Sequence, residues 1–176
     1  TEGLIGRLDD LLLLGVCPDN PEVITAKTAV PTAKPRRTLP VTAACGLCGR
    51  ENLEAFIASL VRVDSSRRYS RAALCRAAAA VRTRQKLFNA TGGAHAVAAF
   101  APTGEVQCLM EDIGRHNAMD KLIGHALLHR LALGEMAVFL SGRTSIEMMV
   151  KAARAAIPIV AAVGAPTAAA VAAADR

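Results

Sequence analysis

The sequence is poor in aromatic residues and has no long apolar run, and each shortage excludes a class of function. Its 176 residues include one Tyr, four Phe and no Trp. Proteins that bind nucleic acid without sequence preference usually stack bases on several aromatic side chains, so we expect no nucleic-acid partner. No apolar stretch is long enough to span a bilayer, and no charged-then-apolar leader precedes a cleavage site. We therefore expect a cytoplasmic protein without a membrane partner.

Acidic residues and cysteines are also limited. The 21 Lys and Arg side chains outnumber the 15 Asp and Glu side chains, which leaves a formal net charge of +6. This excess suits an anionic ligand or an acidic partner surface. Five cysteines are an odd number without the dense spacing of a secreted disulfide scaffold, so a reducing compartment is expected. We expect three of the cysteines to take no part in catalysis: Cys17, Cys75 and Cys108.

Most of the prolines lie in residues 17–40, which predicts an irregular segment there. We divide the chain into an N-terminal segment, residues 1–44, and an α/β domain, residues 45–176. Within the first part, residues 11–14 are expected to form a strand or a short helix, and residues 23–26 a single strand. We therefore expect a small N-terminal segment, residues 1–44, before the larger helix-rich domain.

Apolar residues in the remainder recur with helical or strand spacing in turn. The expected helices are 50–62, 70–88, 115–131 and 144–156, with a last one opening at Pro166, and the expected strands are 95–100, 106–111, 136–140 and 157–163. The first two strands form a hairpin, and the later strand–helix–strand order predicts parallel strands in a mixed sheet.

Four polar turns that contain glycine are expected to converge at one edge of this sheet. Parallel strands bring their carboxyl ends together, and open α/β sheets bind ligands there. Residues 111–116, 141–145 and 164–167 follow such strand ends. Residues 91–95 lead into the antiparallel strand of the hairpin, whose start lies at the same edge. The convergence predicts a crevice that binds an anion.

Individual residues of these turns have both a ligand-binding and a structural interpretation. The sequence Ser-Gly-Arg-Thr-Ser at 141–145 offers hydroxyls, a close backbone approach and a bidentate guanidinium for phosphate, or simply a capped helix with a surface arginine. His116 is expected to point into the crevice as a ligand or proton-transfer group, with Asp120 orienting its ring, or to be a hydrogen-bonded residue at a helix start. Glu111 and Asp112 fit helix capping, Asp112 especially.

The sequence Cys-Gly-Leu-Cys-Gly at 45–49 precedes an amphipathic helix. The helix N-terminus and Arg50 favour a thiolate at Cys45 and Cys48, so sulfur chemistry is expected. A structural zinc site generally needs four ligands, and only one Cys-x-x-Cys pair is present, so no metal site is predicted. A thioredoxin-like redox pair is the second interpretation, because residues 38–44 are a poor lead-in strand.

These segments resemble the formate dehydrogenase accessory sulfurtransferase family, FdhD. The resemblance lies in TEGLI at 1–5, CGLCG at 45–49, TGGAHA at 91–96, EDIGRHNAMDKLIG at 111–124, SGRTSIEMMVKAAR at 141–154 and APT at 165–167. It implies a cytidine deaminase-like three-layer α/β fold with a mixed sheet that forms a homodimer. Zinc deaminases need H-x-E and P-C-x-x-C, which this chain lacks around His95.

The resemblance also implies a sulfur carrier. It takes persulfide sulfur from a cysteine desulfurase and transfers it to the molybdenum (or tungsten) bis-guanine-dinucleotide cofactor of formate dehydrogenase; GDP would mimic part of that cofactor. Cys45 is the implied carrier and Cys48 its partner. A redox module, or a scaffold that only binds formate dehydrogenase, remains the alternative. The predicted cofactor-binding residues are Gly92, Gly93, His95, Arg115, His116, Asn117, Ser141, Gly142, Arg143, Ser145, Pro166 and Thr167.

Overall fold

The computed structural model describes residues 5, 7–31, 58 and 60–175. The chain divides into two compact units, Thr1–Pro40 and Val41–Arg176, each of which is described by itself. The predicted boundary between residues 44 and 45 lies outside the described residues. Within the described part, no helix combines the length and the apolar character that a membrane crossing requires.

The first unit contains a two-stranded antiparallel sheet. A short 3-10 helix, η1 (Leu8–Asp10), leads into β1 (Leu11–Cys17), which pairs with β2 (Asn20–Thr28). The strand expected at 23–26 is confirmed within β2, and residues 11–14 are a strand within β1, but both strands are longer than predicted, so that most of residues 17–28 is regular strand where an irregular segment was expected. Pro21 lacks a backbone donor but is tolerated in β2, because each strand of a two-stranded sheet has an unpaired edge.

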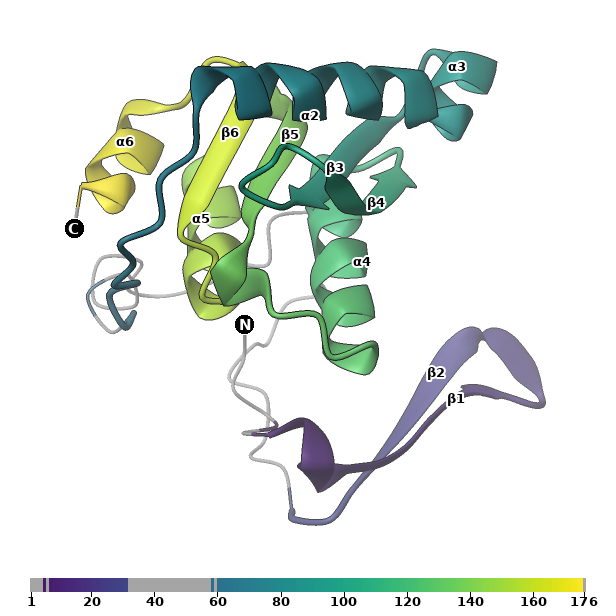
Figure 1. Ribbon diagram of the computed structural model, residues 1–176. Coiled ribbons are helices and arrows are strands. Elements are labelled where there is room, and N and C mark those ends of the chain that lie inside the picture. The colour runs from purple at the N-terminus through teal and green to yellow at the C-terminus, as the bar shows by residue number, and fades with distance from the viewer. Residues whose placement is uncertain (1–4, 6, 32–57, 59, 176) are drawn as a thin grey trace. The chain divides into compact units, whose positions relative to one another are not determined.

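The second unit is built on a four-stranded mixed sheet (Figure 1). Its strands are β3 (His95–Phe100), β4 (Val106–Asp112), β5 (Ala137–Arg143) and β6 (Ile159–Gly164), in the spatial order β4-β3-β5-β6. Strand β3 runs antiparallel to β4 and β5, and β5 runs parallel to β6. The predicted hairpin and the predicted mixed sheet are confirmed.

Helices cover both faces of this sheet and complete three layers (Figure 1). One face carries α2 (Arg71–Arg84), which is followed by α3 (Lys86–Thr91). The other face carries α4 (Arg115–Leu128), the short 3-10 helix η2 (Leu133–Glu135) and α5 (Ile146–Arg154). Helix α6 (Ala168–Ala174) packs beside α5. The mixed α/β class is confirmed. The cytidine deaminase-like arrangement stays a prediction.

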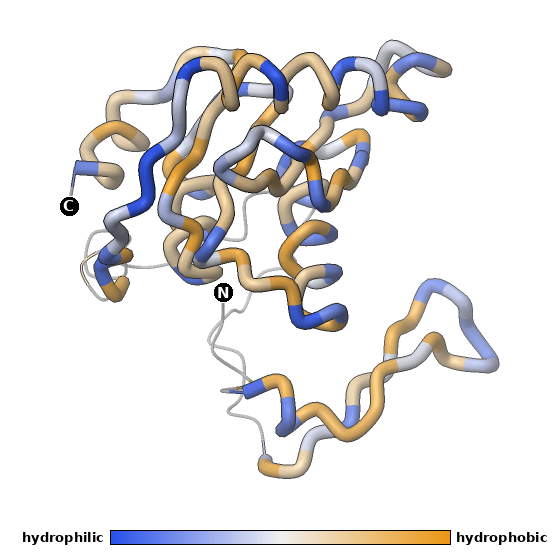
Figure 2. Tube along the Cα trace, in the orientation of Figure 1, coloured by the Kyte–Doolittle hydropathy of each residue, from blue (hydrophilic) through white to orange (hydrophobic). Residues whose placement is uncertain are grey.

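Each face of the sheet has its own apolar core. Met119, Leu122 and Met148 pack between the sheet and α4 and α5. On the opposite face Ala77 and Phe100 belong to the cluster beneath α2. The small alanine side chains let α2 approach the strands closely, which suits a sequence with few large rings. Figure 2 shows hydrophobic residues along much of β5 and β6.

Two helix predictions are wrong in their limits. The helix expected at 70–88 is interrupted at Gln85, where ψ is 80°, so that α2 ends at Arg84 and α3 starts at Lys86. The helix expected at 50–62 lies mostly outside the described residues, but residues 60–62 are not helical. Periodicity locates an apolar face well, whereas helix ends depend on local capping contacts.

Candidate functional site

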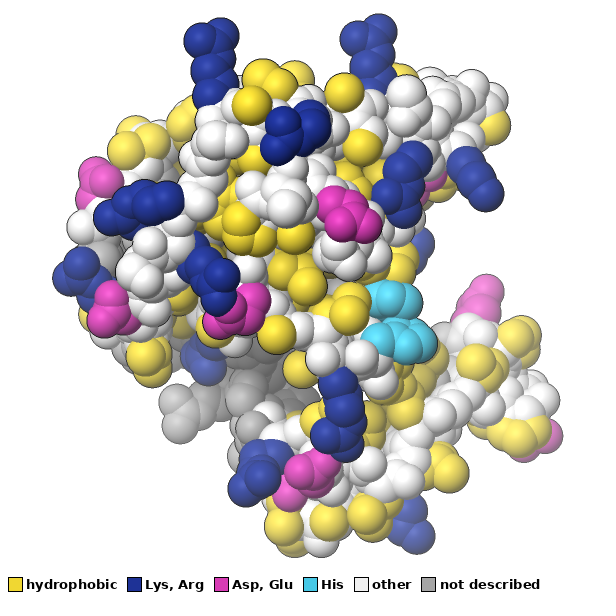
Figure 3. Space-filling model, in the orientation of Figure 1, with side chains coloured by type: hydrophobic (Ala, Val, Ile, Leu, Met, Phe, Trp, Pro, Cys, Tyr) yellow, Lys and Arg dark blue, Asp and Glu magenta, His cyan; other side chains and the backbone are white. Residues whose placement is uncertain are grey.

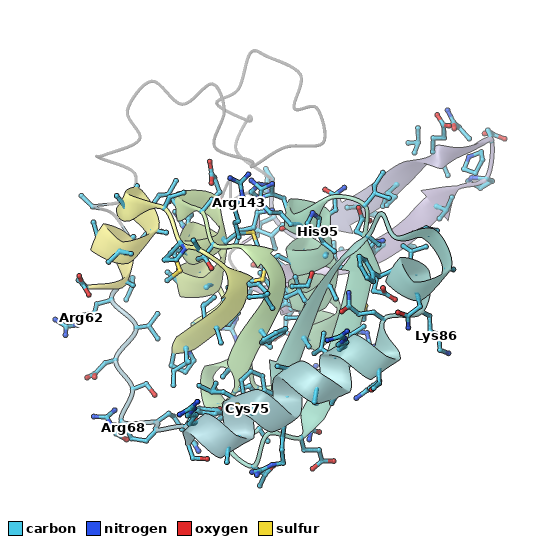
Figure 4. All side chains as sticks on the ribbon, turned by 90° about the horizontal axis from the view of Figure 1, so that it is seen from above. Arg62, Arg68, Cys75, Lys86, His95 and Arg143 are labelled. Atoms are coloured by element: carbon cyan, nitrogen blue, oxygen red, sulfur yellow. The ribbon has the colours of Figure 1, made fainter. Side chains whose placement is uncertain are left out.

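The four turns predicted to converge do meet at one edge of the sheet. His95, which starts β3, lies opposite Asp112 at the end of β4. Arg143, at the end of β5, lies opposite Gly164 at the end of β6. Figure 4 shows the labelled Arg143 and His95 at this same edge. We call it the carboxyl edge, because β4, β5 and β6 all end there.

Glycine is required where these turns pack against one another. A Cβ added at Gly142 would lie 3.1 Å from His95 Nδ1. One added at Gly164 would lie 2.9 Å from the backbone nitrogen of Arg143. Ser141 takes part in the sheet itself, since its hydroxyl accepts a hydrogen bond of 2.8 Å from the Ala96 N–H. The carboxyl edge is therefore tightly fixed, and the exposed Arg143 side chain extends from it.

Asp112 and Glu111 serve two different helices. Asp112 Oδ1 accepts hydrogen bonds from the Gly114 N–H (2.9 Å) and the Asn117 side-chain amide (3.2 Å), so it supports the turn before α4 but is not the N-cap residue, which is Gly114. Its other oxygen lies 2.6 Å from Lys121 Nζ, and this hydrogen bond lowers the pKa of Asp112. Glu111 instead accepts the backbone N–H groups of α3 at Leu87 and Phe88, each at 2.9 Å.

His116 is buried, with only 6% of its surface exposed, as its predicted inward position requires. Its Nδ1 has no hydrogen-bond partner among the described residues, and neither has Arg115 Nε. Burial lowers the pKa of His116, and the charges of Arg115 and Lys151 lower it further against the opposite effect of Glu147 and Asp120. A neutral imidazole with a free nitrogen is therefore held just inside the carboxyl edge.

Asp120 does not orient the His116 ring in the way predicted. Its carboxylate accepts a hydrogen bond of 2.5 Å from Lys151 Nζ, which also donates to the His116 backbone carbonyl at 3.3 Å. Lys151 is only 5% exposed. Because it lies on α5 and both of its partners lie on α4, these two hydrogen bonds join the helices. The sequence analysis missed this residue, because the pair joins two helices and forms no local motif.

Glu147 is a second residue that the sequence analysis missed. Burial raises the pKa of Glu147, but the Ser145 hydroxyl, a backbone N–H and the nearby charge of Arg115 outweigh burial, so the pKa is lowered overall. Glu147 and Lys151 stand four residues apart on α5, a spacing that puts both on one helix face.

A hollow of about 870 Å³ lies on the α2 side of the sheet. Four predicted site residues line it: Gly92, Gly93, His95 and Ser141. Its other lining residues were not predicted; Arg82, Gln85 and Phe88 are among them. We call this cavity the α3 hollow. The predicted cofactor residues are thus divided between the α3 hollow and the opposite face, where His116 is buried against α5.

The remaining predicted residues lie at the turn before α6 or outside the described residues. Pro166 and Thr167 are exposed, and the Thr167 N–H donates to the Thr144 carbonyl at 3.0 Å. The Thr167 hydroxyl caps α6 by accepting from the Ala170 N–H. Ser145 occupies the N-cap position of α5 without a side-chain capping bond. Cys45 and Cys48 lie outside the described residues.

The other thiols and histidines have environments of different kinds. Cys108 is buried, and burial raises the pKa of its thiol, which fits the inert role predicted for it. Cys75 is exposed on α2, away from the carboxyl edge (Figure 4). The ring centres of His125 and His129 lie 4.1 Å apart near the end of α4. Figure 3 shows histidine side chains next to each other on the molecular surface.

The family comparison covers the whole chain: the pattern of the FdhD/NarQ family matches residues 1–176. The chain belongs to this family. A protein named "Sulfur carrier protein FdhD" from Sulfurisphaera tokodaii is 37% identical over 172 residues, which cover 97% of this chain and 65% of the relative. One of the same name from Mycolicibacterium paratuberculosis is 37% identical over 100% of this chain and 70% of its own length.

Other FdhD/NarQ relatives match a shorter stretch. The Burkholderia cenocepacia protein of the same name is 43% identical over 135 residues, which are 75% of this chain and 49% of that protein. The chain thus spans between about half and 70% of the length of these relatives. A solved structure described as a formate dehydrogenase accessory protein from Desulfotalea psychrophila matches this chain with a TM-score of 0.74 and 23% sequence identity. The match covers 99% of this chain and 64% of the solved one. It supports the fold.

Proposed function

We propose that this chain is a sulfur carrier. It accepts persulfide sulfur from a cysteine desulfurase on Cys45 and delivers it to the molybdenum or tungsten bis-guanine-dinucleotide cofactor of formate dehydrogenase. Family membership carries the proposal, since relatives that match nearly the whole chain are named sulfur carrier proteins. The chain then acts in the cytoplasm as a homodimer and has formate dehydrogenase as a further partner.

The first transfer step needs no external oxidant. The Cys45 thiolate attacks the terminal sulfur of the desulfurase persulfide, one S–S bond forms as another breaks, and the desulfurase cysteine leaves as a thiolate. Cys48 stands three residues away, as the partner thiol in the same sequence. In delivery, the acceptor site of the substrate cofactor supplies the electron pair for a new bond to the outer sulfur, the S–S bond to Cys45 breaks, and Cys45 returns to its thiolate. Such a carrier needs an accessible thiol of low pKa.

The carboxyl edge supports the proposed cofactor as the substrate. That cofactor carries phosphate groups, and Arg143 offers an exposed guanidinium beside the turn at Gly142. Arg115 Nε and His116 Nδ1 are polar atoms without partners among the described residues. The space above Gly92 is open, because an added Cβ would meet nothing within 4 Å. The donor set and the open turns fit a large anion.

The test of the proposal is sulfur loading. The protein is incubated with a cysteine desulfurase and ³⁵S-labelled cysteine, and the label is located by peptide mapping. We expect label on Cys45 and its loss by at least ten-fold in Cys45→Ala, whereas Cys75→Ala, which removes an exposed thiol on α2, should load like the wild type. Equal loading of Cys45→Ala would refute the assignment. A reversible Cys45–Cys48 disulfide without any sulfur loading would support the redox module instead.

A further inference from the structure

The side of α2 that faces solvent carries positive charge. Between residues 65 and 104 the sequence contains no Asp or Glu, although Arg recurs through the segment. Helix α2 buries Ala73, Ala77 and Val81 against the sheet, so its opposite side is exposed. We call this side, with Arg68 just before the helix, the basic face of α2. It consists of Arg68, Arg71, Cys75, Arg76, Ala79 and Arg82, all of which are exposed. Figure 3 shows Lys and Arg side chains projecting over α2.

Arg71 is a cation of this face that the fold itself does not use. Two other arginines of α2 have internal partners, since Arg76 donates to the Thr103 carbonyl and Arg84 donates to the Val106 carbonyl. No hydrogen bond or ion pair joins Arg71 to another described residue. Its exposed guanidinium is therefore available to an external carboxylate, which it can bind through two parallel hydrogen bonds.

The cations gather at the end of α2 where helix stability disfavours them. Arg71 is the first residue of α2, and the first turn of this helix contains no acidic side chain. Arg68 stands three residues before it. The positive end of a helix dipole favours acidic side chains and disfavours basic ones. Arg68 and Arg71 therefore act against the stability of α2, and an acidic surface bound beside them would relieve this repulsion.

The basic face begins at the edge of the sheet opposite the carboxyl edge. Ala73 lies against Gly104, and Arg76 binds Thr103, in the turn where β3 ends and before β4 starts. Figure 4 shows the labelled Arg68 and Cys75 on the other side of the second unit from Arg143. A partner bound at this end of α2 would therefore leave the carboxyl edge open to the proposed cofactor.

The side chains of the basic face favour an acidic protein surface over other anionic partners. Between the cations stand Cys75 and Ala79, and neither offers the large apolar side chain that enters a membrane surface. The face has no aromatic ring on which a nucleic-acid base could stack. A second copy of this chain would bring the same cations together across a two-fold axis, where they repel. The small side chains also let a protein surface approach closely.

We infer that the basic face of α2 is the docking surface for an acidic surface of the sulfur donor. The inference rests on the proposed function, in which that donor is a cysteine desulfurase. Formate dehydrogenase receives the cofactor and so must approach the carboxyl edge, whereas the donor needs no access to the cofactor. Charges at such an interface speed the encounter of the two proteins and select the partner. The donor is then held apart from the cofactor while it loads the carrier.

The inference is tested by calorimetry with the cysteine desulfurase that loads the protein, without cysteine, so that no sulfur is transferred. Arg68→Glu and Arg71→Glu should each weaken binding about five-fold, and the double variant about twenty-fold. Arg71→Lys keeps the charge and should bind within about two-fold of the wild type. The matched control is Lys27→Glu, which makes the same charge change at an exposed position of β2 and should bind like the wild type.

Two further measurements locate the contact and its origin. Raising NaCl from about 0.1 M to about 1 M shortens the screening length from about 10 Å to about 3 Å, and should weaken the wild type more than the double variant. Cys75 is an exposed thiol one helical turn from Arg71. Its alkylation by iodoacetamide, followed by peptide mapping, should slow about five-fold in the presence of saturating desulfurase, because a thiol reacts only when it is accessible.

Each outcome supports or overturns the docking surface. Unchanged affinity in the double variant, an equal loss in Lys27→Glu, or unchanged alkylation of Cys75 would overturn it. Binding of phosphatidylserine vesicles or poly(U) RNA that is lost in the double variant, with desulfurase affinity unchanged, would overturn the protein partner. Docking without any label on Cys45 would refute the proposed sulfur transfer and leave the surface standing. Thermal unfolding checks each variant, and the wild-type salt dependence and Cys75 alkylation decide the matter should the double variant not fold.

Discussion

At the scale of single residues, His116 stands out within the described part of the chain, because its buried ring lies among charged groups. Its imidazole is buried among charged groups from two helices: Arg115 on α4, and Glu147 and Lys151 on α5. Lys151 secures the backbone below the ring, and Nδ1 remains without a partner among the described residues. A neutral imidazole with a free ring nitrogen can accept a hydrogen bond from a group that approaches it. The structure confirms that the ring points inward, and its ligand or proton-transfer role stays a prediction.

The depressed pKa of His116 predicts a loss of stability in mild acid. Burial is the main cause, so the native protein resists protonation while the unfolded chain binds a proton at about pH 6.5. The stabilisation is complete above about pH 6.5 and declines as the pH falls from there toward the lower pKa of the folded state. Urea unfolding should therefore show a steeper fall in the free energy of unfolding for the wild type than for His116→Gln.

The matched control for this measurement is His129→Gln, at an exposed histidine near the end of α4. It should keep the pH dependence of the wild type. Parallel curves for the wild type and His116→Gln would contradict the prediction, because no stability would then be linked to the protonation of His116.

At the scale of elements, α3 depends on a strand for its start. Its N-cap residue, Gln85, makes no side-chain capping bond. The Glu111 carboxylate binds the N–H groups of Leu87 and Phe88 instead. A carboxylate at a helix N-terminus is favourable both as an acceptor and as a negative charge. Glu111 thereby links β4 to the helix that borders the α3 hollow.

Glu111→Ala should therefore loosen α3 without unfolding the sheet. Loss of an N-terminal cap costs about 1 kcal/mol, which corresponds to a rise of roughly five-fold in amide exchange. We expect this rise at Leu87 and Phe88 by hydrogen–deuterium exchange with NMR detection, and little change at the buried strand β3. The control is Glu105→Ala, which removes an exposed carboxylate from the turn between β3 and β4; it should leave the amide exchange rates of α3 unaltered. Equal protection of Leu87 in Glu111→Ala and the wild type would refute the capping role.

The same contact shows what could be predicted from sequence and what could not. The carboxyl edge was predictable, because strand order and direction alone place the turns at His95 and Arg143 together. The start of a new helix after Gln85 was not, since the carboxylate that caps this helix belongs to Glu111, more than twenty residues away in another element. Lys151 escaped detection for the same reason: its partner Asp120 is 31 residues distant. Cys45 and Cys48 lie outside the described residues, so their roles stay predictions.

At the scale of the whole second unit, the layers are joined by close backbone contact as well as by apolar cores. The turn between β3 and β4 packs against the beginning of α2, where Arg76 donates hydrogen bonds to the Thr103 carbonyl. Gly104 in this turn is buried and has a φ of +87°. A Cβ at Gly104 would lie 2.5 Å from the carbonyl oxygen of Ala73, a distance that requires backbone movement.

Gly104→Ala should consequently weaken the packing of α2 on the sheet. A left-handed φ and a backbone clash together cost about 2–4 kcal/mol, or a fall of roughly 5–15 °C in Tm for a domain of this size. Gly124→Ala is the matched control, because Gly124 lies within α4 and an added Cβ meets nothing within 4 Å. That variant should gain about 0.5–1 kcal/mol from its better helix propensity. Similar melting temperatures for the two variants would mean that the turn can move away from Ala73, and that the layers are held by their apolar cores alone.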